Sequence, residues 1–360
     1  MALDLDTLLT PVADDAPSGP DPRADYSPQS LYFQLRDARS DARAAERAAD
    51  TDPAAEADAL GHWRRVADLA VKALAGTRDL EIAAWLTEAL VREEGLSGLA
   101  QGAALLEGLA RNFWDDLHPM PDEDGMETRV AAVAGLNGLG GDGTLIQPLR
   151  KIVVFEQPDG TEVAFFLFQQ AEEVAAIGDE NRRAARLQAG APDLDALETE
   201  ARAAGGAHFT ALLGEAEAAL AAWRRMGEVF DAAAGADSPP TSRVAEVVGQ
   251  IADFARRFAP VAEQPGAAAA AADGAAVPGG GMPAVSAAPG QIVAREDALR
   301  QLGEIAAFFR RTEPQSPISM TLDEAVRRAR MSWLELLAEI QPDDGTRQAM
   351  LTALGIKPEA

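Results

Sequence analysis

The sequence predicts a mainly α-helical protein, with helical bundle domains, one small β-hairpin, a flexible linker and a small all-α C-terminal oligomerisation domain. Three observations carry this prediction. Large apolar residues recur at steps of three and four along most of the chain, which is the period of an amphipathic helix. A single pair of β-branched and aromatic runs flanks a turn sequence. A stretch of Pro, Gly and Ala separates the last helical segment from the rest.

The composition argues against several classes of protein. The 360 residues carry 58 Asp+Glu against 32 Lys+Arg, which gives a formal net charge of −26. Nucleic acids and anionic membranes attract proteins through Lys and Arg, so neither is an expected partner. The lack of cysteine removes disulfides, thiolate nucleophiles and Cys-ligated metals. The sequence starts without a signal-peptide pattern and has no run of about 18 apolar residues, so we expect a cytoplasmic protein without membrane insertion.

The first part of the chain predicts an arm and a bundle. Residues 1–27 are rich in Pro, Asp and Gly, so we expect an extended arm rather than a helix. Residues 28–138 predict an antiparallel helical domain of about five helices. The apolar positions that carry this prediction are Leu60, Trp63, Val66, Ala70 and Leu74, then Leu80, Ala83, Leu86 and Leu90, then Leu99, Ala103, Leu106, Leu109 and Phe113, and finally Met126, Val130, Val133 and Leu136.

A second, mostly helical domain is predicted over residues 150–259. It contains the clearest strand signal, because residues 152–155 and 163–168 are apolar runs on either side of the turn sequence at 157–160. This pattern predicts a β-hairpin over residues 151–168. Helical periods resume at residues 192–204 and 207–232, and again along the face formed by Val244, Val247, Val248, Ile251, Phe254 and Phe258.

The C-terminal part is predicted to associate with other copies of itself. Residues 260–290 hold almost no large apolar side chain and are predicted to form a disordered Pro/Gly/Ala linker. Residues 291–360 return to helical periods, but a unit of this size rarely gains more than a few kcal/mol from its own core, so burial between copies is expected to supply the rest. The residues assigned to that contact are Phe308, Phe309, Pro314, Pro317, Trp333, Leu334, Leu337 and Ile340.

The charge is unevenly shared between these parts. Residues 295–357 hold nine Lys+Arg and ten Asp+Glu, so almost all of the net charge of −26 lies outside them. The sequence therefore predicts acidic N-terminal domains and a nearly neutral C-terminal one.

The sequence predicts no catalytic, metal or cofactor site. Residues 138–143 spell G-x-G-x-x-G, but a helix is predicted before them and a strand after them, so we expect a loop rather than a dinucleotide site. None of His62, His118 and His208 has the spacing of zinc ligands, and the first two are expected at the surface or at a helix end. A hydrolase built on paired carboxylates, such as Asp115 and Asp116, stays as a rival interpretation.

Twelve residues in a particular order and spacing carry a resemblance to a known family. They are Pro11, Pro17, Gly19, Asp21, Tyr26, Trp63, Asp79, Leu80, Gly95, Trp114, Pro119 and Arg129. Through them, residues 8–130 resemble the ImpA N-terminal domain of the TssA proteins of bacterial type VI secretion systems. Residues 308–310 (FFR), 313–317 (EPQSP) and 327–337 resemble the ending of short-form TssA proteins.

The resemblance implies a non-enzymatic, cytoplasmic assembly protein. TssA-like proteins form ring-shaped homo-oligomers through their C-terminal domains, with roughly ten or more subunits expected here. They present their N-terminal domains to baseplate, inner-tube and sheath proteins, and so start or coordinate polymerisation of the contractile tail. The short form favours a place at the baseplate, and a distal sheath cap is the alternative within the family. A helical adaptor that dimerises through its C-terminus in another cytoplasmic complex is the alternative outside it.

Overall fold

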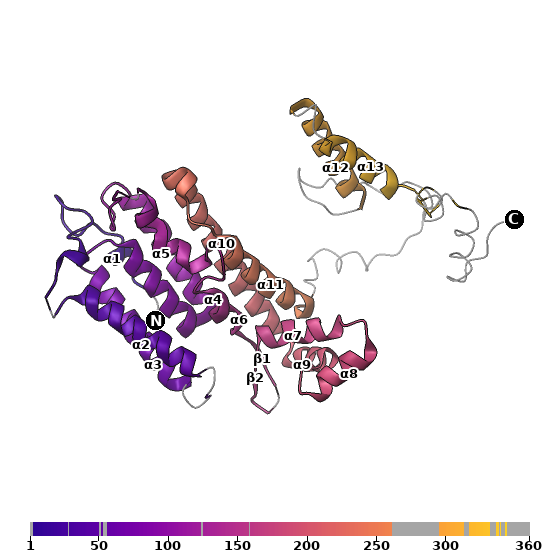
Figure 1. Cartoon of the computed structure of the whole chain (residues 1–360), viewed down its shortest axis with the longest axis horizontal. Coiled ribbons are helices and arrows are strands. Elements are labelled where there is room, and N and C mark those ends of the chain that lie inside the picture. The colour runs from indigo at the N-terminus through magenta and orange to yellow at the C-terminus, as the bar shows by residue number, and fades with distance from the viewer. Residues whose placement is uncertain are drawn as a thin grey trace, which may run out of the picture. The chain divides into compact units, whose positions relative to one another are not determined.

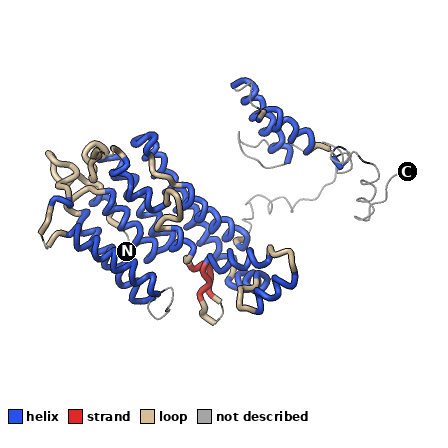
Figure 2. Tube along the Cα trace, viewed as in Figure 1, coloured by secondary structure: helices blue, strands red, loops and turns tan. Residues whose placement is uncertain are grey.

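Helices make up most of the described chain, together with one two-stranded sheet (Figure 2). The structure, a computed structural model, describes residues 3–27, 29–49, 52, 56–123, 125–157, 159–260, 295–312, 317–331, 336–337, 339 and 343. The chain divides into two compact units, Met1–Pro265 and Gly266–Ala360. Among the described residues, no helix is both long enough and apolar enough to cross a bilayer.

The first unit is a stack of neighbouring helices (Figure 1). Helix α2 packs on α3, α3 on α4, α4 on α10 and α10 on α11. The helices are α1 (Leu5–Leu8), α2 (Leu31–Ala49), α3 (Glu56–Leu74), α4 (Leu80–Phe113), α5 (Glu127–Asn137), α6 (Ile146–Arg150), α7 (Phe165–Ala175), α8 (Glu180–Gln188), α9 (Leu194–Ala204), α10 (Gly206–Ala234) and α11 (Ser242–Phe258), with 3-10 turns η1 (Pro22–Ala24) and η3 (Gly235–Asp237) and strands β1 (Val153–Glu156) and β2 (Glu162–Ala164).

Helix α4 reverses its direction at Gly95, whose φ of 57° and ψ of −126° are open to glycine but not to most residues. The two halves then pack closely. A methyl group on Gly98 would lie 2.1 Å from the carbonyl oxygen of Leu90, and one on Gly102 would lie 2.5 Å from the Thr87 side chain. The two leucine stripes that the sequence predicts as separate helices are therefore the two halves of α4, lying antiparallel to each other.

We expect Gly98→Ala to lower the free energy of unfolding by about 1–3 kcal/mol, because the added methyl group meets a main-chain carbonyl that cannot move aside cheaply. Gly61→Ala is the matched control. Gly61 also lies within a helix, α3, and a methyl group there would meet no atom within 4 Å. That control should gain about 0.5–1 kcal/mol from helix propensity. Urea unfolding of both variants measures the difference, and an equal effect at the two positions would contradict the close packing of α4.

A continuous core joins the segments predicted as two helical domains. One cluster of buried residues runs from Leu8 to Ala255 and includes side chains of α4, α10 and α11. Trp114 packs edge-on against Phe230 of α10, with ring centroids 6.0 Å apart. Residues 28–138 and 150–259 are therefore parts of one compact unit.

The predicted hairpin is present, but its second strand is shorter than expected. Strands β1 and β2 pair antiparallel, with Val153 opposite Ala164 and Glu156 opposite Glu162. The strand predicted to continue to residue 168 ends at Ala164, and the residues after it begin α7. A short apolar run has the same appearance in a strand and in a buried helix. Here Phe168 packs edge-on against Phe254 of α11, 4.5 Å between centroids, which favours the helix.

The N-terminal segment is not extended throughout. Asp4 caps the short helix α1 by accepting a hydrogen bond from the Thr7 main-chain N–H at 3.1 Å. Leu8 at the end of α1 is buried in the core of the unit. Residues 9–21 are irregular and η1 follows them. The prediction of an extended arm is wrong for residues 5–8, because one apolar side chain anchors a helical turn that composition alone does not reveal.

The second unit contains helices α12 (Arg295–Thr312) and α13 (Ile318–Ala329), which pack against each other. Leu299 and Ala306 are buried in this unit, and Arg310 forms an ion pair with Asp323. Leu337 is half-buried. Several predicted residues lie outside the described part, namely Pro314, Trp333, Leu334, Ile340 and residues 261–290 of the predicted linker.

Candidate functional site

Several residues of the ImpA-like pattern meet where the N-terminal segment docks on the helices. The main-chain N–H of Arg78 donates to Ser18 O at 2.7 Å, and the N–H of His118 donates to Arg78 O at 3.1 Å. The N–H of Leu80 in turn donates to His118 O at 2.8 Å. Three segments that are far apart in the sequence are thus joined side by side. We call this region the junction, and it is formed by residues 10–23, 77–81 and 114–119.

Arg78 anchors the N-terminal segment to the junction. Its guanidinium group is buried and donates to the carbonyl oxygens of Thr10, Leu74 and Thr77, with distances of 2.5 Å to Thr10 O and 2.9 Å to Thr77 O. It also lies 5.7 Å from the ring centroid of Phe113. Burial lowers the pKa of Arg78, because a charged group loses its hydration there. The carbonyl dipoles replace that hydration, so the charge of Arg78 stabilises the folded chain.

Asp79 performs two tasks at the start of α4. Its side chain is fully buried, and Oδ1 accepts a hydrogen bond from Ile82 N at 2.9 Å, which caps the helix. Oδ2 accepts from Arg23 at 2.7 Å, and Arg23 also contacts Glu81 at 2.6 Å. Burial alone would lower the pKa of Arg23, but the hydrogen bonds and charges of the two carboxylates outweigh it and raise the pKa.

Tyr32 extends this network to helix α2. Its hydroxyl donates to Glu81 at 3.0 Å, and its ring stacks on Trp85 with ring centroids 5.7 Å apart. Burial, together with the charge of Glu81, raises the pKa of Tyr32 to about 12, so the hydroxyl keeps its proton near neutral pH.

The third segment of the junction contains His118 and Pro119, which are joined by a cis peptide bond. His118 is buried, and its Nε2 lies 3.0 Å from Gly19 O. The docked N-terminal segment covers His118, so the expectation of a surface position is wrong. The alternative of a position at a helix end is met, because His118 O accepts the N–H of Leu80 at the start of α4. Arg129 of α5 donates to Trp114 O at 2.6 Å and to Pro119 O at 3.1 Å, and so holds this segment against α5.

Gly19 shows why the docked segment follows this particular path. Its φ of +68° lies in the left-handed region, and a methyl group there would lie 2.5 Å from the carbonyl oxygen of Gly76. Close to it, Pro17 O accepts a hydrogen bond from Val12 N at 2.8 Å, and Asp21 caps η1 through the N–H of Arg23 at 3.0 Å. Pro11 is exposed beside these contacts. The Pro and Gly residues of the pattern thus shape the segment that Arg78 anchors.

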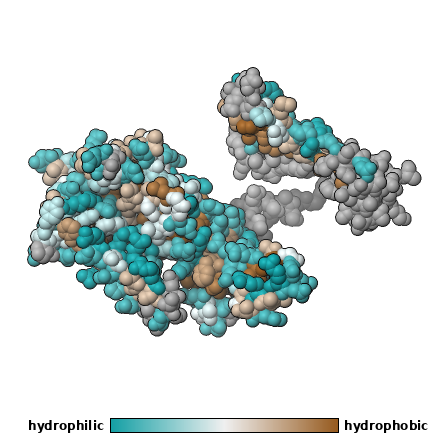
Figure 3. All heavy atoms as spheres, viewed as in Figure 1, coloured by the Kyte–Doolittle hydropathy of each residue, from teal (hydrophilic) through white to brown (hydrophobic). Residues whose placement is uncertain are grey.

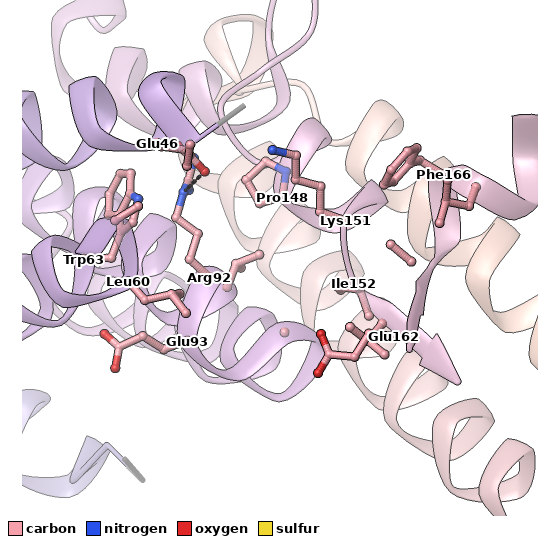
Figure 4. Close-up of a pocket in the computed structure, with 17 residues that line it drawn as sticks. Glu46, Leu60, Trp63, Arg92, Glu93, Pro148, Lys151, Ile152, Glu162 and Phe166 are labelled. Atoms are coloured by element: carbon pink, nitrogen blue, oxygen red, sulfur yellow. Dashed lines mark hydrogen bonds and ion pairs between the residues drawn. The ribbon is translucent and has the colours of Figure 1, made fainter. Parts of the chain in front are cut away.

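The other residues of the pattern lie away from the junction contacts. Tyr26 is 84% exposed, with its ring 6.3 Å from that of Phe33. Trp63 and Gly95 instead line a groove of about 790 Å³ between α3, α4 and the β-hairpin (Figure 4). The two arginines of the junction have their partners within the fold, since Arg23 pairs with Asp79 and Glu81 and Arg78 donates to main-chain carbonyl oxygens. Among the described residues, no three His, Asp or Glu side chains are placed to hold a metal ion.

Glu93, which lines the groove, makes the folding stability of the first unit depend on pH. Burial raises its pKa above the ordinary value of 4.5, although the charge of Arg64 opposes this. A raised pKa favours folding at low pH, and this contribution is lost as the pH rises through the folded-state pKa. We therefore expect Glu93→Gln to raise the melting temperature at pH 7, with a gain that shrinks towards pH 4. Glu215→Gln, at an exposed position, controls for the removed charge, and a gain that stays constant with pH would contradict this assignment.

The second unit exposes apolar side chains on both of its helices. On α12, Ile305 is 44% and Phe308 is 52% exposed, and on α13 Ile318 is 42% and Met320 is 75% exposed. Hydrophobic surface is visible on this unit in Figure 3. Among the residues predicted for self-association, Phe308 and Pro317 are exposed, while Phe309 is half-buried with its ring 5.7 Å from Phe308. Exposed apolar side chains mark a protein–protein contact where they form a contiguous patch.

Comparison with known proteins identifies relatives for most of the chain. Residues 9–138 match the family described as ImpA, N-terminal, type VI secretion system. The type VI secretion system component TssA1 of Pseudomonas aeruginosa is 29% identical over 365 residues, covering 95% of this chain and 96% of that protein. The solved N-terminal domain of the TssA component of the type VI secretion system from Burkholderia cenocepacia, which includes the conserved ImpA_N region, is 31% identical with a TM-score of 0.58. It covers 72% of this chain and 94% of the solved chain.

Proposed function

Because the chain belongs to the TssA family of type VI secretion system components, we propose that it is a non-enzymatic scaffold that forms a homo-oligomeric ring at the baseplate. In this role the second unit associates with its copies. The first unit contacts baseplate, inner-tube and sheath subunits in the cytoplasm, and so helps to start or coordinate tail polymerisation.

One observation carries this proposal, namely the exposed apolar surface of the small second unit. Phe308 and Met320 expose more than half of their area in a unit whose described core is small. Burying these side chains between copies would stabilise an oligomer at roughly 25 cal/mol per Å² of apolar area. The exposed groups therefore supply the driving force for self-association that the sequence predicts.

The uneven charge supports a division of labour between the two units. Nearly all of the net charge of −26 lies outside residues 295–357. If the copies associate through their nearly neutral second units, the acidic first units repel one another. The first units would then stay accessible to other subunits. Linking many first units in one ring also raises the effective concentration for each contact, and this mechanism needs no catalytic residue.

The proposal predicts a large gain in affinity from oligomerisation. Full-length protein is expected to bind a surface coated with purified baseplate subunits at least about a hundredfold more tightly than residues 1–265 alone. The reason is that several first units of one oligomer bind the surface at once. Biolayer interferometry at equal concentrations of first units measures the ratio. Equal affinities would contradict the scaffold mechanism, and binding to sheath but not to baseplate subunits would favour the distal cap.

A further inference from the structure

The groove that contains Trp63 and Gly95 has two unlike walls (Figure 4). One wall comes from α3 and α4 and includes Leu60 and Val91. The other comes from the hairpin and α7, where Val153 is 39% and Phe166 is 41% exposed. Val153 and Phe166 remain in contact with water, and the groove volume of about 790 Å³ is large enough for several side chains of a bound molecule.

Two cationic residues, Arg92 and Lys151, line the groove, and both already have interaction partners. Arg92 donates to both carboxylate oxygens of Glu46, at 2.8 and 2.9 Å, and its guanidinium lies 4.0 Å from the ring centroid of Trp63. Glu46 and Arg92 thus neutralise each other within the groove. The charges at its edges must therefore come from other residues.

Carboxylates stand on both walls of the groove. Figure 4 shows Glu93 on the α4 side and Glu162 on the hairpin side. Glu93 lies 3.9 Å from Arg64 through Oε2, while its buried Oε1 has no hydrogen-bond partner among the described residues. Glu162 is exposed and stands directly opposite Glu156 in the hairpin. Like charges at opposed strand positions repel each other, so a cation at this edge would be stabilising.

From these contacts we infer that the groove docks an amphipathic segment of a partner protein, with apolar side chains against Val153 and Phe166 and an Arg or Lys between Glu93 and Glu162. The charge at the edge selects a cationic over an anionic segment, and the acidic character of the whole chain acts in the same direction. The inference deepens the scaffold role and rests on it for the assumption that the occupant belongs to another protein.

Two labelled peptides test the groove on the full-length chain. Both are about 15 residues long, roughly four helical turns, with the same Leu and Phe positions, and they carry Arg in one peptide and Glu in the other at the polar positions. Fluorescence anisotropy is expected to show saturable binding of the Arg peptide only. Phe166→Ala should weaken this binding by about tenfold. Glu93→Gln and Glu162→Gln should each weaken it by about fivefold.

Matched variants outside the groove separate docking from general attraction. Leu139→Ala changes an apolar side chain that is 72% exposed, and Glu215→Gln removes an exposed carboxylate of α10. Neither residue lines the groove, so both variants should bind the Arg peptide like the parent chain. Circular dichroism melting of each variant checks that the fold is intact.

Three results would overturn the inference. They are equal binding of the two peptides, equal losses in the groove and control variants, and binding that appears only after deletion of residues 261–294. The last result would make the chain's own segment the occupant. The affinity ratio for intact baseplate subunits is measured separately. If the peptide experiment fails, the proposed scaffold function still stands, and if the affinity ratio fails, the peptide result still stands.

Discussion

Asp79→Ala is expected to lower the free energy of unfolding of the first unit by about 2–5 kcal/mol, because it removes both a helix cap and a charge-assisted hydrogen bond. The substitution leaves the N–H of Ile82 at the start of α4 without its cap and leaves Arg23 without its contact at 2.7 Å. The docked N-terminal segment should also lose protection in hydrogen exchange. Chemical unfolding monitored by circular dichroism measures the energy.

Asp179→Ala is the matched control, because Asp179 caps α8 in the same way through Arg182 N at 3.0 Å but is exposed. Its loss should cost only about 1 kcal/mol, the value of a cap alone. Asp79→Asn, which keeps an oxygen for the cap, should fall between the two. If Asp79→Ala and Asp179→Ala had equal costs, Asp79 would be an ordinary cap and the junction would not hold the N-terminal segment.

Phe308→Asp combined with Met320→Asp is expected to dissociate the proposed oligomer into single chains. Both side chains are more than half exposed on the second unit, and a carboxylate at each position would have to lose its hydration on entering a contact between copies. Sedimentation velocity on the full-length chain measures the result. The melting temperature of the first unit should not change, because neither residue belongs to it.

Leu139→Asp provides the control for this pair of substitutions, since Leu139 is a comparably exposed apolar residue of the first unit. It should leave the oligomer unchanged. Dissociation by Leu139→Asp, or an intact oligomer in the Phe308 and Met320 double variant, would place the contact between copies elsewhere.

The helical class of the fold could be predicted because it depends on local spacing. The leucine stripes at 80–90 and 99–113 each form one half of α4, and the tight reversal between them occurs at a glycine that the sequence shows plainly. The start of α7 could not be predicted in this way. Residues 165–168 are all apolar, so this short run shows neither the helical nor the strand periodicity. Their conformation is decided by packing, in which Phe168 contacts Phe254.

The junction depends on contacts that no local pattern contains. Arg23 and Glu81 are 58 residues apart in the sequence, yet their side chains meet at 2.6 Å. The resemblance pointed to Asp79, Trp114 and Arg129, but only the structure reveals that they support the fold. The groove likewise combines residues from α2 to α7, and its acidic edge comes from Glu93 and Glu162 on separate elements. All eight residues predicted for self-association stay predictions, and four of them, Pro314, Trp333, Leu334 and Ile340, lie outside the described residues.

The most direct test of the scaffold is the absolute mass of the full-length chain and of residues 1–265, measured by light scattering after size exclusion. Self-association through the second unit predicts one discrete particle of roughly ten or more subunits for the full-length chain and a monomer for residues 1–265. A monomeric full-length chain, or the same large particle formed by residues 1–265, would contradict it.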